Sequence, residues 1–172
     1  MRLCLEPVDQ ANYRLILPWR NAPDVRAQMQ TQHNISETEH RKWFERIQTD
    51  STERWFICRE VNSDPIGVVN FKKINEKNGT AFWGFFSAPK KPKGTGSKIL
   101  HAALCYAFLD LNLAKVFADV RASNEISIHL HKKFGFTEIS CSFANCNHRK
   151  SRVKMKRFSL KREDWEKNIL ND

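Results

Sequence analysis

The sequence predicts an α/β fold in which a central, mixed and mostly antiparallel sheet is flanked by helices. Three strand-like runs follow one another between residues 53 and 87, separated only by turn residues, as in an antiparallel meander. An apolar stripe with helical period comes next, over residues 99–111. Strand-like and helical patterns then alternate as far as residue 160. This order indicates a layered fold around a mixed sheet.

The first fifty residues are expected to open the sheet and to form helices. Ser36 and Glu39 make a capping box, in which the serine caps the helix and the glutamate follows three residues on. The helix that they start carries Trp43, Phe44 and Ile47 on one face. The other elements expected here are a strand over Arg2–Pro7, a helix over about 9–17 ending near Pro18, a turn over Trp19–Pro23 and a short helix over Asp24–Gln30.

The meander and the segments after it supply the remaining elements. Asn62–Asp64 and Glu76–Gly79 have the composition of turns and separate the three strands of the meander. The elements expected are strands over Arg54–Val61, Pro65–Ile74, Thr80–Ser87 and Lys115–Val120, helices over 99–111 and about Asn124–Phe134, and two closing antiparallel strands over Phe136–Ser142 and Ser151–Leu160.

Length and composition are those of a soluble globular chain. We expect one domain over residues 1–172. No apolar run approaches the roughly 18–20 residues that span a bilayer, and Glu6 and Asp9 interrupt the apolar stretch that a signal peptide needs. We therefore expect a cytoplasmic protein with no membrane partner. The five cysteines form no Cys-x-x-Cys pair, so we expect no metal site.

The net charge of +10 implies an anionic partner. Nucleic acid, a polyanionic cofactor and a nucleotide-linked substrate all carry the required charge. The basic residues of Arg152–Arg157 alternate with apolar ones, as on the solvent face of a strand, and no RNA-recognition signature is present. We therefore expect no nucleic-acid partner. The oligomeric state stays open, with a homodimer as one option.

A basic, glycine-containing loop at Pro89–Lys98 is the most informative segment. It follows a strand-like run and opens the helix with the apolar stripe. Glycines allow consecutive backbone N–H groups to converge, and the N-terminus of a helix adds positive potential. We expect the N–H groups of Lys93–Ser97 to bind a pyrophosphate, with Lys91 and Lys98 adding point charge. A simple turn that caps a helix is the alternative for this loop taken alone.

A second segment, Asn124–Phe136, follows about thirty residues later. The loop Lys91-Pro92-Lys93-Gly94-Thr95-Gly96 resembles the Arg/Gln-x-x-Gly-x-Gly/Ala pattern of the GCN5-related N-acetyltransferases, the GNAT superfamily. The second segment resembles that family's Asn-x-x-Ala/Ser-x-x-Leu-Tyr-x-Lys-x-Gly-Phe pattern, with matches at Asn124, Ser127, Leu130, Lys133, Gly135 and Phe136. The resemblance covers nearly the whole chain. It implies the GNAT fold, acetyl-CoA as acetyl donor and N-acetyltransferase activity.

The resemblance also implies which residues bind and act on acetyl-CoA. His131 takes the place of the family's tyrosine, which protonates the departing thiolate. A neutral imidazole keeps one N–H to donate, and an imidazolium is a stronger acid. A bulge in Gly84–Ser87 would splay two strands and aim a backbone N–H, at Phe86 or nearby, at the thioester carbonyl. The residues implied to bind the cofactor are Phe85, Phe86, Ser87, Lys91, Lys93, Gly94, Thr95, Gly96, Ser97, Lys98, Asn124 and Ser127.

Phe82 stands where many relatives carry a glutamate that acts as a base through water. No protein base is therefore evident. This suits an acceptor amine that is already substantially deprotonated, with positioning of the two substrates providing most of the rate.

The first third of the chain resembles one GNAT subgroup in the segment Arg20-Asn21-Ala22-Pro23, in Met29 and in the spacing of His40 and Trp43. That subgroup acetylates the 4-amino group of a UDP-linked amino-deoxy sugar on the route to pseudaminic acid, which is placed on bacterial flagellin. The resemblance implies an acceptor of the UDP-4-amino-4,6-dideoxy-N-acetyl-altrosamine type, contacted by Arg20, Met29, His40, Trp43 and Lys73. Met29 and Trp43 also suit a plain core role.

Other functions remain open. A ribosomal-protein or peptide N-terminal acetyltransferase shares the Trp-Arg and Trp-Phe features at Trp19-Arg20 and Trp43-Phe44. A peptide acceptor often requires acidic pocket residues, and few are present here, which favours the nucleotide sugar. A non-catalytic CoA-binding domain and an RNA-binding module have less support, because the aromatic residues follow strand and helix periods rather than forming exposed stacking platforms.

Overall fold

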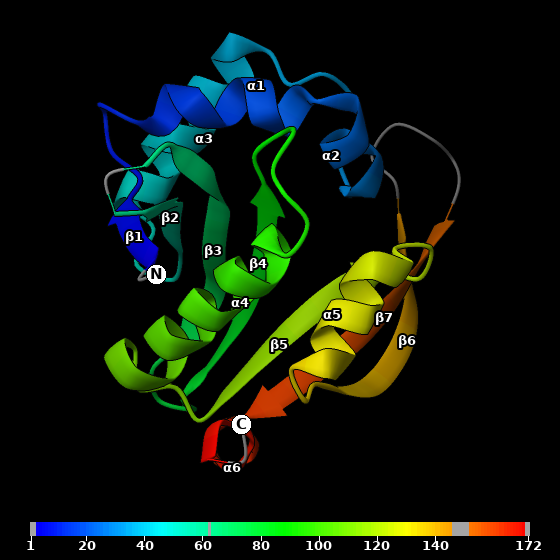
Figure 1. Ribbon diagram of the computed structural model, residues 1–172. Helices are drawn as coiled ribbons and strands as arrows, with labels where there is room; N and C mark the ends of the chain where they lie inside the picture. Colours follow the sequence, from blue (N-terminus) through cyan, green and yellow to red (C-terminus); the bar gives the residue numbers. More distant parts are fainter. Residues whose placement is uncertain (1–2, 62, 146–151, 171–172) are drawn as a thin grey trace.

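The computed structural model describes residues 3–61, 63–145 and 152–170. Within them, seven strands form one sheet in the order β1-β2-β3-β4-β5-β7-β6 (Figure 1). Every neighbouring pair is antiparallel except β4 and β5, which are parallel. The expected mixed, mostly antiparallel sheet is confirmed. The strands are β1 (Leu3–Pro7), β2 (Arg54–Glu60), β3 (Pro65–Asn75), β4 (Thr80–Ser87), β5 (Lys115–Arg121), β6 (Thr137–Asn145) and β7 (Arg152–Lys161).

Helices cover both faces of the sheet. Figure 1 shows α4 and α5 in front of the sheet and α3 behind it, with α1 crossing above and α6 below. The flanking helices expected from the sequence are therefore present on both sides. The helices are α1 (Ile16–Asn21), α2 (Pro23–Gln28), α3 (Glu37–Thr49), α4 (Thr95–Cys105), α5 (Glu125–Lys133) and α6 (Arg162–Leu170).

Two apolar clusters form because successive strand residues point to opposite faces. The larger lies under α4 and α5 and includes Phe71 and Phe158, while the smaller lies under α3 and includes Phe44 and Ile57. The capping box that starts α3 is confirmed. The backbone N–H at the third helical position donates to Ser36 Oγ at 3.2 Å, and the Ser36 N–H donates to a Glu39 carboxylate oxygen at 2.8 Å.

The only parallel contact in the described sheet is short. β4 and β5 pair at Thr80–Phe82 with Lys115–Phe117, three residues on each strand, and no further. Beyond Phe82 and Phe117 the two strands diverge, as Figure 1 shows. We call this diverging stretch the β4–β5 split. It separates an antiparallel half-sheet, β1–β4, from a second one, β5-β7-β6.

The expected bulge in Gly84–Ser87 is wrong. β4 pairs with β3 without interruption from Phe82 to Ser87. The irregularity lies instead between Lys72 and Asn75 of β3, where Lys73 has a φ of +51°. The split therefore comes from the shortness of the parallel pairing and not from an extra residue in β4.

The N-terminal helices differ from the predicted ones. A 3-10 turn at Tyr13–Leu15 leads into α1, which contains Pro18 and continues to Asn21. Pro18 is the third residue of α1, where no intrahelical N–H bond is required, so it does not end the helix. The chain turns only at Ala22, whose ψ of 134° is the extended value favoured before a proline.

Some elements near the C-terminus were missed or shortened by the prediction. α6 was not predicted, and a π-helical turn at Tyr106–Asp110 ends the long helical stripe. β6 continues past Ser142 to Asn145. β7 matches the expected last strand, whose first residue, Ser151, lies outside the described residues.

Candidate active site

The predicted anion loop occupies the link between β4 and α4. Gly94 is the N-cap of α4 with a φ of +89°, a conformation that glycine adopts without strain. The Thr95 hydroxyl donates to the Pro92 carbonyl at 2.8 Å and closes the loop. The N–H groups of Lys93, Gly94 and Gly96 find no acceptor among the described residues. These amides, at the positive end of an 11-residue helix, are available to an anion.

The lysines of the loop differ in their surroundings. Lys98 forms an ion pair with Glu60, with 2.6 Å between Nζ and the carboxylate oxygen. Its charge is therefore shared with a carboxylate. Lys91 is half-buried and Lys93 is exposed, and neither has an acidic partner in the described part of the chain. The Ser97 N–H donates to Gly94 O at 3.0 Å, so the loop itself uses that amide.

Gly96 joins the two sequence motifs. A Cβ at this position would lie 3.4 Å from a Leu130 methyl carbon on α5 and 3.6 Å from the Phe85 ring on β4. Glycine therefore allows α4 to approach both elements closely. On α5, Asn124 is the N-cap, and its side-chain oxygen accepts the Ser127 N–H at 3.1 Å. Asn124 and Ser127 thus fix the start of α5, the helix whose Leu130 meets Gly96.

The register of β4 decides which amides face the split. Backbone groups of an antiparallel strand turn alternately to either side. Ala88 donates its N–H to Ile66 O on the β3 side at 2.8 Å, and the pairing is continuous through Phe86 and Val68. Phe86 therefore turns its N–H toward β3, and Phe85 and Ser87 turn theirs toward the split. The Phe86 N–H, expected to face the thioester carbonyl, is therefore used within the sheet, and the Phe86 side chain packs in the α3 core.

His131 is buried, with 3% of its surface exposed. Its Nδ1 lies 2.7 Å from the Ser127 carbonyl oxygen, which only accepts hydrogen bonds, so Nδ1 carries the proton. Burial lowers the pKa of the imidazole, although the bond to Ser127 opposes this. In the neutral ring, Nε2 then has a lone pair and no proton. The expectation that the neutral imidazole could donate to a thiolate is wrong for this tautomer, and the acid role stays a prediction for the imidazolium alone.

The opposite side of the sheet holds two half-buried cations. Arg20 Nη2 donates to Thr31 O at 2.8 Å, while Nη1 is buried and finds no partner in the described chain. Burial, and then the charge of Arg26, lower the pKa of this guanidinium. Lys72 lies with Nζ 4.8 Å from the centre of the Trp55 ring.

The pKa of Lys72 is also lowered. Burial is the main cause, and the charges of Arg46 and Arg20 act in the same direction. Glu53 opposes the shift, but its carboxylate is already bonded to Arg46, at 3.0 Å, and to the Trp55 indole N–H, at 2.7 Å. Arg20 and Lys72 thus form a positive site without a carboxylate of its own.

Aromatic rings continue from this positive site along α3. His40 stacks on Trp43, with 4.9 Å between ring centres, and Trp43 meets the edge of Trp55 at the same distance. His40 is buried, and its Nε2 donates to Tyr13 O at 2.8 Å, which ties α3 to the turn before α1. The geometry gives His40 a supporting role behind Trp43 instead of a direct contact.

Met29 packs against the same apolar cluster as Trp43, and the substrate contacts expected of Met29 and Lys73 stay predictions. The Met29 carbonyl accepts a bond from Arg121 Nη1 at 3.1 Å, which links the end of α2 to the end of β5 across the split. Lys73 is exposed in the irregular part of β3, with Nζ 5.3 Å from the centre of the Phe82 ring. Lys72, its neighbour, is the lysine that reaches Trp55.

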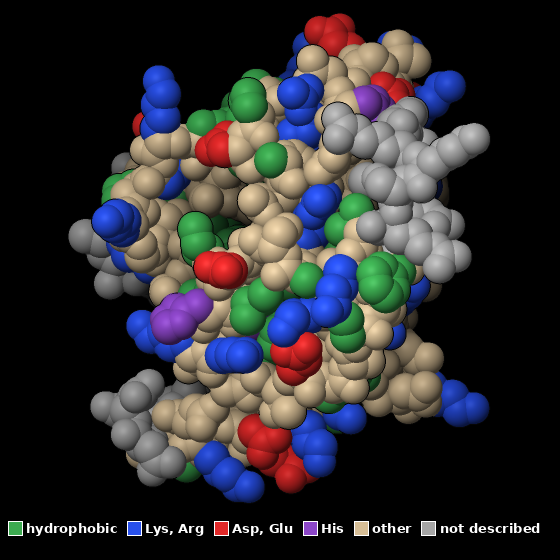
Figure 2. Space-filling model, turned by 90° about the vertical axis from the view of Figure 1, so that its right-hand side faces the viewer, with side chains coloured by type: hydrophobic (Ala, Val, Ile, Leu, Met, Phe, Trp, Pro, Cys, Tyr) green, Lys and Arg blue, Asp and Glu red, His purple; other side chains and the backbone are tan. Residues whose placement is uncertain are grey.

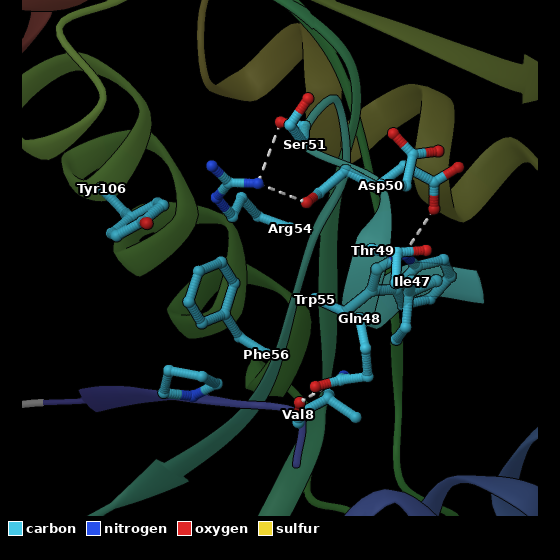
Figure 3. A pocket seen from close by; sticks show the side chains of 12 residues that line it. Val8, Ile47, Gln48, Thr49, Asp50, Ser51, Arg54, Trp55, Phe56 and Tyr106 are labelled. Atoms are coloured by element: carbon cyan, nitrogen blue, oxygen red, sulfur yellow. Dashed lines mark hydrogen bonds between the residues drawn. The ribbon is translucent and has the colours of Figure 1, made fainter. Parts of the chain in front are cut away.

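A pocket of about 500 Å³ opens beside Glu53 and Trp55, two neighbours of Lys72 (Figure 3). It lies between the end of α3, the start of β2 and Tyr106, directly after the C-terminal end of α4. Figure 3 shows Arg54 in it, donating to the backbone carbonyls of Ser51 and Glu53. The loop with free amides is at the N-terminal end of α4, so this pocket is not the predicted cofactor site.

The described residues contain no group of three or more His, Cys, Asp or Glu side chains that could hold a metal ion. Cys4 and Cys141 are exposed, and burial raises the pKa of the Cys58 thiol to about 12. In the part of the chain that the structure describes, no helix combines the length and apolar character needed to cross a membrane.

Comparison with known proteins identifies the family. The family model described as "Acetyltransferase (GNAT) domain" matches residues 2–137. This chain is a GNAT acetyltransferase. It is 30% identical over 124 residues to the acetyltransferase PseH of Campylobacter jejuni, which covers 72% of this chain and 76% of that protein. It is 32% identical over 90 residues to the spermidine N(1)-acetyltransferase of Vibrio cholerae, 52% of each chain.

Solved structures show the same fold. The crystal structure of the spermidine N-acetyltransferase from Vibrio cholerae in complex with CoA and spermine superposes with a TM-score of 0.86 at 23% identity, covering 95% of this chain and 98% of that one. The expected GNAT fold and N-acetyltransferase activity are confirmed, and acetyl-CoA is the acetyl donor. The identities of the individual site residues stay predictions.

The structure of this GNAT brings together some of the residues expected at the site and separates others. The free amides of the loop, Phe85 and α5 lie around one end of the split. Arg20 and Trp43 lie on the other side of the sheet. The charge of Arg20 acts on Lys72, Lys72 lies over Trp55, and Trp55 meets Trp43. Lys72 was missed because the resemblance pointed to Lys73, whereas Lys72 lies in the regular part of β3 and shares the α3 side of the strand with Val68.

Proposed function

We propose that this GNAT acetylates the 4-amino group of a UDP-linked amino-deoxy sugar on the route to pseudaminic acid. The similarity to PseH over 72% of the chain supports this assignment. The observation that carries it is the half-buried Arg20 guanidinium, whose buried Nη1 has no partner among the described residues. A buried cation without a carboxylate is costly unless an anion completes it, and a diphosphate supplies that anion.

The surroundings of Arg20 fit the rest of a nucleotide sugar. Lys72 is a second cation for the diphosphate, and Trp43 and Trp55 are half-buried aromatic rings with faces or edges suited to a base or sugar ring. Arg20 is better suited than lysine to phosphate, because its planar fork can form two parallel bonds.

A polyamine acceptor is the second candidate, since curated relatives and solved neighbours of the chain include spermidine acetyltransferases. Spermidine is a polycation, and a site for it requires carboxylates. Arg20 and Lys72 would repel it, and the nearby Glu53 is already bonded to Arg46 and Trp55. Charge therefore favours the nucleotide sugar over the polyamine.

The face drawn in Figure 2 gives no support to a nucleic-acid partner. Figure 2 shows Lys and Arg side chains interspersed with Asp and Glu over the visible face, without a continuous basic stripe. A nucleic-acid footprint concentrates basic residues along a face or groove. The charge of +10 is explained more simply by two diphosphate-containing substrates.

On the donor side, the proposed arrangement follows from the amides. The pyrophosphate of acetyl-CoA binds the N–H groups of Lys93, Gly94 and Gly96, with Lys91 nearby. The pantetheine arm extends along the split, where the N–H of Phe85 or Ser87 stabilises the negative charge that develops on the thioester oxygen. The acceptor amine approaches from the Arg20 side of the sheet.

An acceptor panel tests the proposal. We expect rapid release of CoA with UDP-4-amino-4,6-dideoxy sugars, and at least about 10²-fold lower kcat/KM with spermidine, spermine and N-terminal peptides, because a site built for paired polar contacts discriminates strongly. CoA release measured by mass spectrometry, with each acceptor at equal concentration, gives the comparison. Preferred acetylation of spermidine or of a peptide would overturn the proposal.

Binding of acetyl-CoA is tested separately by thermal melting. Because the loop forms only in the native state, a hundredfold excess over Kd should raise Tm by about 5–10 °C. Gly94→Val should abolish the shift, since a side chain at a φ of +89° is strained and enters the open space above the amides. Lys98→Ala is the matched control and should keep most of the shift, because Lys98 is paired with Glu60. An unchanged Tm in the wild-type protein would contradict acetyl-CoA binding at this loop.

A further inference from the structure

Two polar side-chain atoms near the closed end of the β4–β5 split have no hydrogen-bond partner in the described chain. They are Nε1 of Trp83 and Nε2 of His131. Both residues are buried, with exposures of 5% and 3%. The two rings are neighbours, with 5.3 Å between their centres and 46° between their planes. Leaving either atom unpaired costs about 1–3 kcal/mol, so the pair points to a bound group.

The two atoms have opposite hydrogen-bonding character. The indole N–H of Trp83 only donates. Nε2 of His131 only accepts while the ring is neutral, because Nδ1 donates to Ser127 O. One small group that accepts from Trp83 and donates to His131 satisfies both, and water is the simplest such group.

The position of the pair connects it to the reaction. Trp83 directly follows Phe82, the last β4 residue that pairs with β5. The Trp83 ring also stacks on that of Phe85, with 5.3 Å between centres, and the backbone N–H of Phe85 faces the split. The unpaired nitrogens therefore lie beside the stretch of β4 that carries the Phe85 N–H, one of the two donors proposed for the thioester oxygen.

We propose that Trp83 and His131 hold one water molecule at the closed end of the split, and that His131 is a proton carrier that first accepts the proton of the acceptor amine through this water. The inference rests on the proposed function for the identity of the amine and for the position of the thioester. Trp83 acts as a positioning residue. Phe82 occupies the place of a possible base, and His131 supplies the base function from the other wall.

The proton and electron balance is complete. The amine nitrogen forms a C–N bond to the thioester carbon, and its proton passes through the water to Nε2, giving an imidazolium. The C–S bond then breaks with its electron pair on sulfur. The imidazolium returns the proton to that sulfur, releasing CoA with a thiol and leaving the neutral ring.

The surroundings of His131 keep it neutral before reaction. Three rings pack against it: Trp83 of β4, Phe158 of β7, and Phe136, which directly precedes β6. None of these rings carries a charge. On its own helix, Lys132 and Lys133 are exposed to solvent, and Ser127 is the hydrogen-bond partner. Burial lowers the pKa, so the ring starts as an acceptor at neutral pH.

A first experiment reads the tautomer without any acceptor. Heteronuclear NMR of the histidine ring nitrogens in the free protein should show His131 with a protonated Nδ1 and a bare Nε2. Trp83→Phe should shift the Nε2 resonance, whereas Trp165→Phe, which removes another buried indole in the α6 region, should not. A proton on Nε2, or no shift in Trp83→Phe, overturns the proposal even if the acceptor assignment is correct.

A second experiment reads the direction of proton transfer, with the best acceptor found in the panel. If His131 must first be neutral, kcat/KM rises as pH increases through the lowered pKa of His131, and this rise is missing in His131→Ala. Trp83→Phe should lower kcat about tenfold with little change in the KM for acetyl-CoA, while Trp165→Phe keeps both. A rate that falls with rising pH through the same pKa would assign the imidazolium as the starting form and overturn the proposal.

Discussion

Replacing His131 with alanine is expected to lower kcat by about 10²-fold, the usual loss when a group that moves a proton in the transition state is removed. The KM for acetyl-CoA should change little, because the ring interacts with developing charge and not with the bound ground state. Steady-state kinetics with varied acetyl-CoA and saturating acceptor give both parameters. His129→Ala is the matched control, since His129 is exposed on the same helix and should keep wild-type rates.

His131 is buried, so its loss could also weaken packing. His131→Phe keeps a ring against Trp83 and Phe158 but has no nitrogen, and should be as slow as the alanine variant while melting at a higher temperature. His131→Tyr separates the two directions of transfer, because a phenol donates a proton but accepts one poorly. Wild-type turnover in both His131→Ala and His131→Phe would remove the residue from the mechanism and leave solvent water as the proton donor.

The second large effect is expected at the positive site on the acceptor side. Lys72→Ala should raise the KM for the nucleotide sugar about 10–100-fold, because a charge-assisted hydrogen bond contributes about 1.5–3 kcal/mol and each 1.4 kcal/mol is a factor of ten. Arg20→Ala should act in the same direction and at least as strongly. The KM for acetyl-CoA should stay within about threefold of wild type, since neither residue lies near the loop.

Lys73→Ala is the matched control for Lys72→Ala. Lys73 is the next residue, equally charged but exposed over Phe82, and its loss should leave the acceptor KM unchanged. Arg20 also holds Thr31 O, so the melting temperature of Arg20→Ala must be measured alongside the kinetics. Equal loss of affinity for both substrates, or a loss of folding alone, would mark the two cations as structural.

Much of the fold was predictable from local chemistry. The capping box of α3, the turns of the meander and the stripe of α4 each depend on residues that are close in sequence, where side-chain spacing and backbone preference decide the outcome. α6 was missed because Arg162–Leu170 carries few apolar residues, and Trp165, which anchors the helix, contacts Phe108 from a distant part of the chain. Charges at its two ends favour a helix, with acidic residues in the first turn and Lys167 in the last, and tertiary packing of Trp165 adds to them.

The elements that carry the candidate site were predictable from the sequence, and the register of those elements was not. The loop and the α5 motif were located by their sequences, yet the direction of the Phe85 and Phe86 amides depends on how β4 pairs with β3. In the same way, Lys72 keeps the regular pairing of β3 and reaches Trp55, while Lys73 has a positive φ and lies over Phe82, a local departure that the sequence pattern does not reveal. The tautomer of His131 depends on Ser127 O, a backbone atom whose position becomes known only with the helix.

The distribution of the cysteines has a practical consequence for measuring this enzyme. Thiol reagents report the CoA that each turnover releases, but they also react with accessible protein thiolates, and Cys4 and Cys141 are exposed. Cys58 will not contribute, because a buried thiol with a pKa of about 12 is almost entirely protonated at neutral pH. In a colorimetric assay, the reaction of these protein thiols therefore adds an initial signal that is proportional to enzyme concentration. Serine at positions 4 and 141 would lower that background at two surface positions remote from the split.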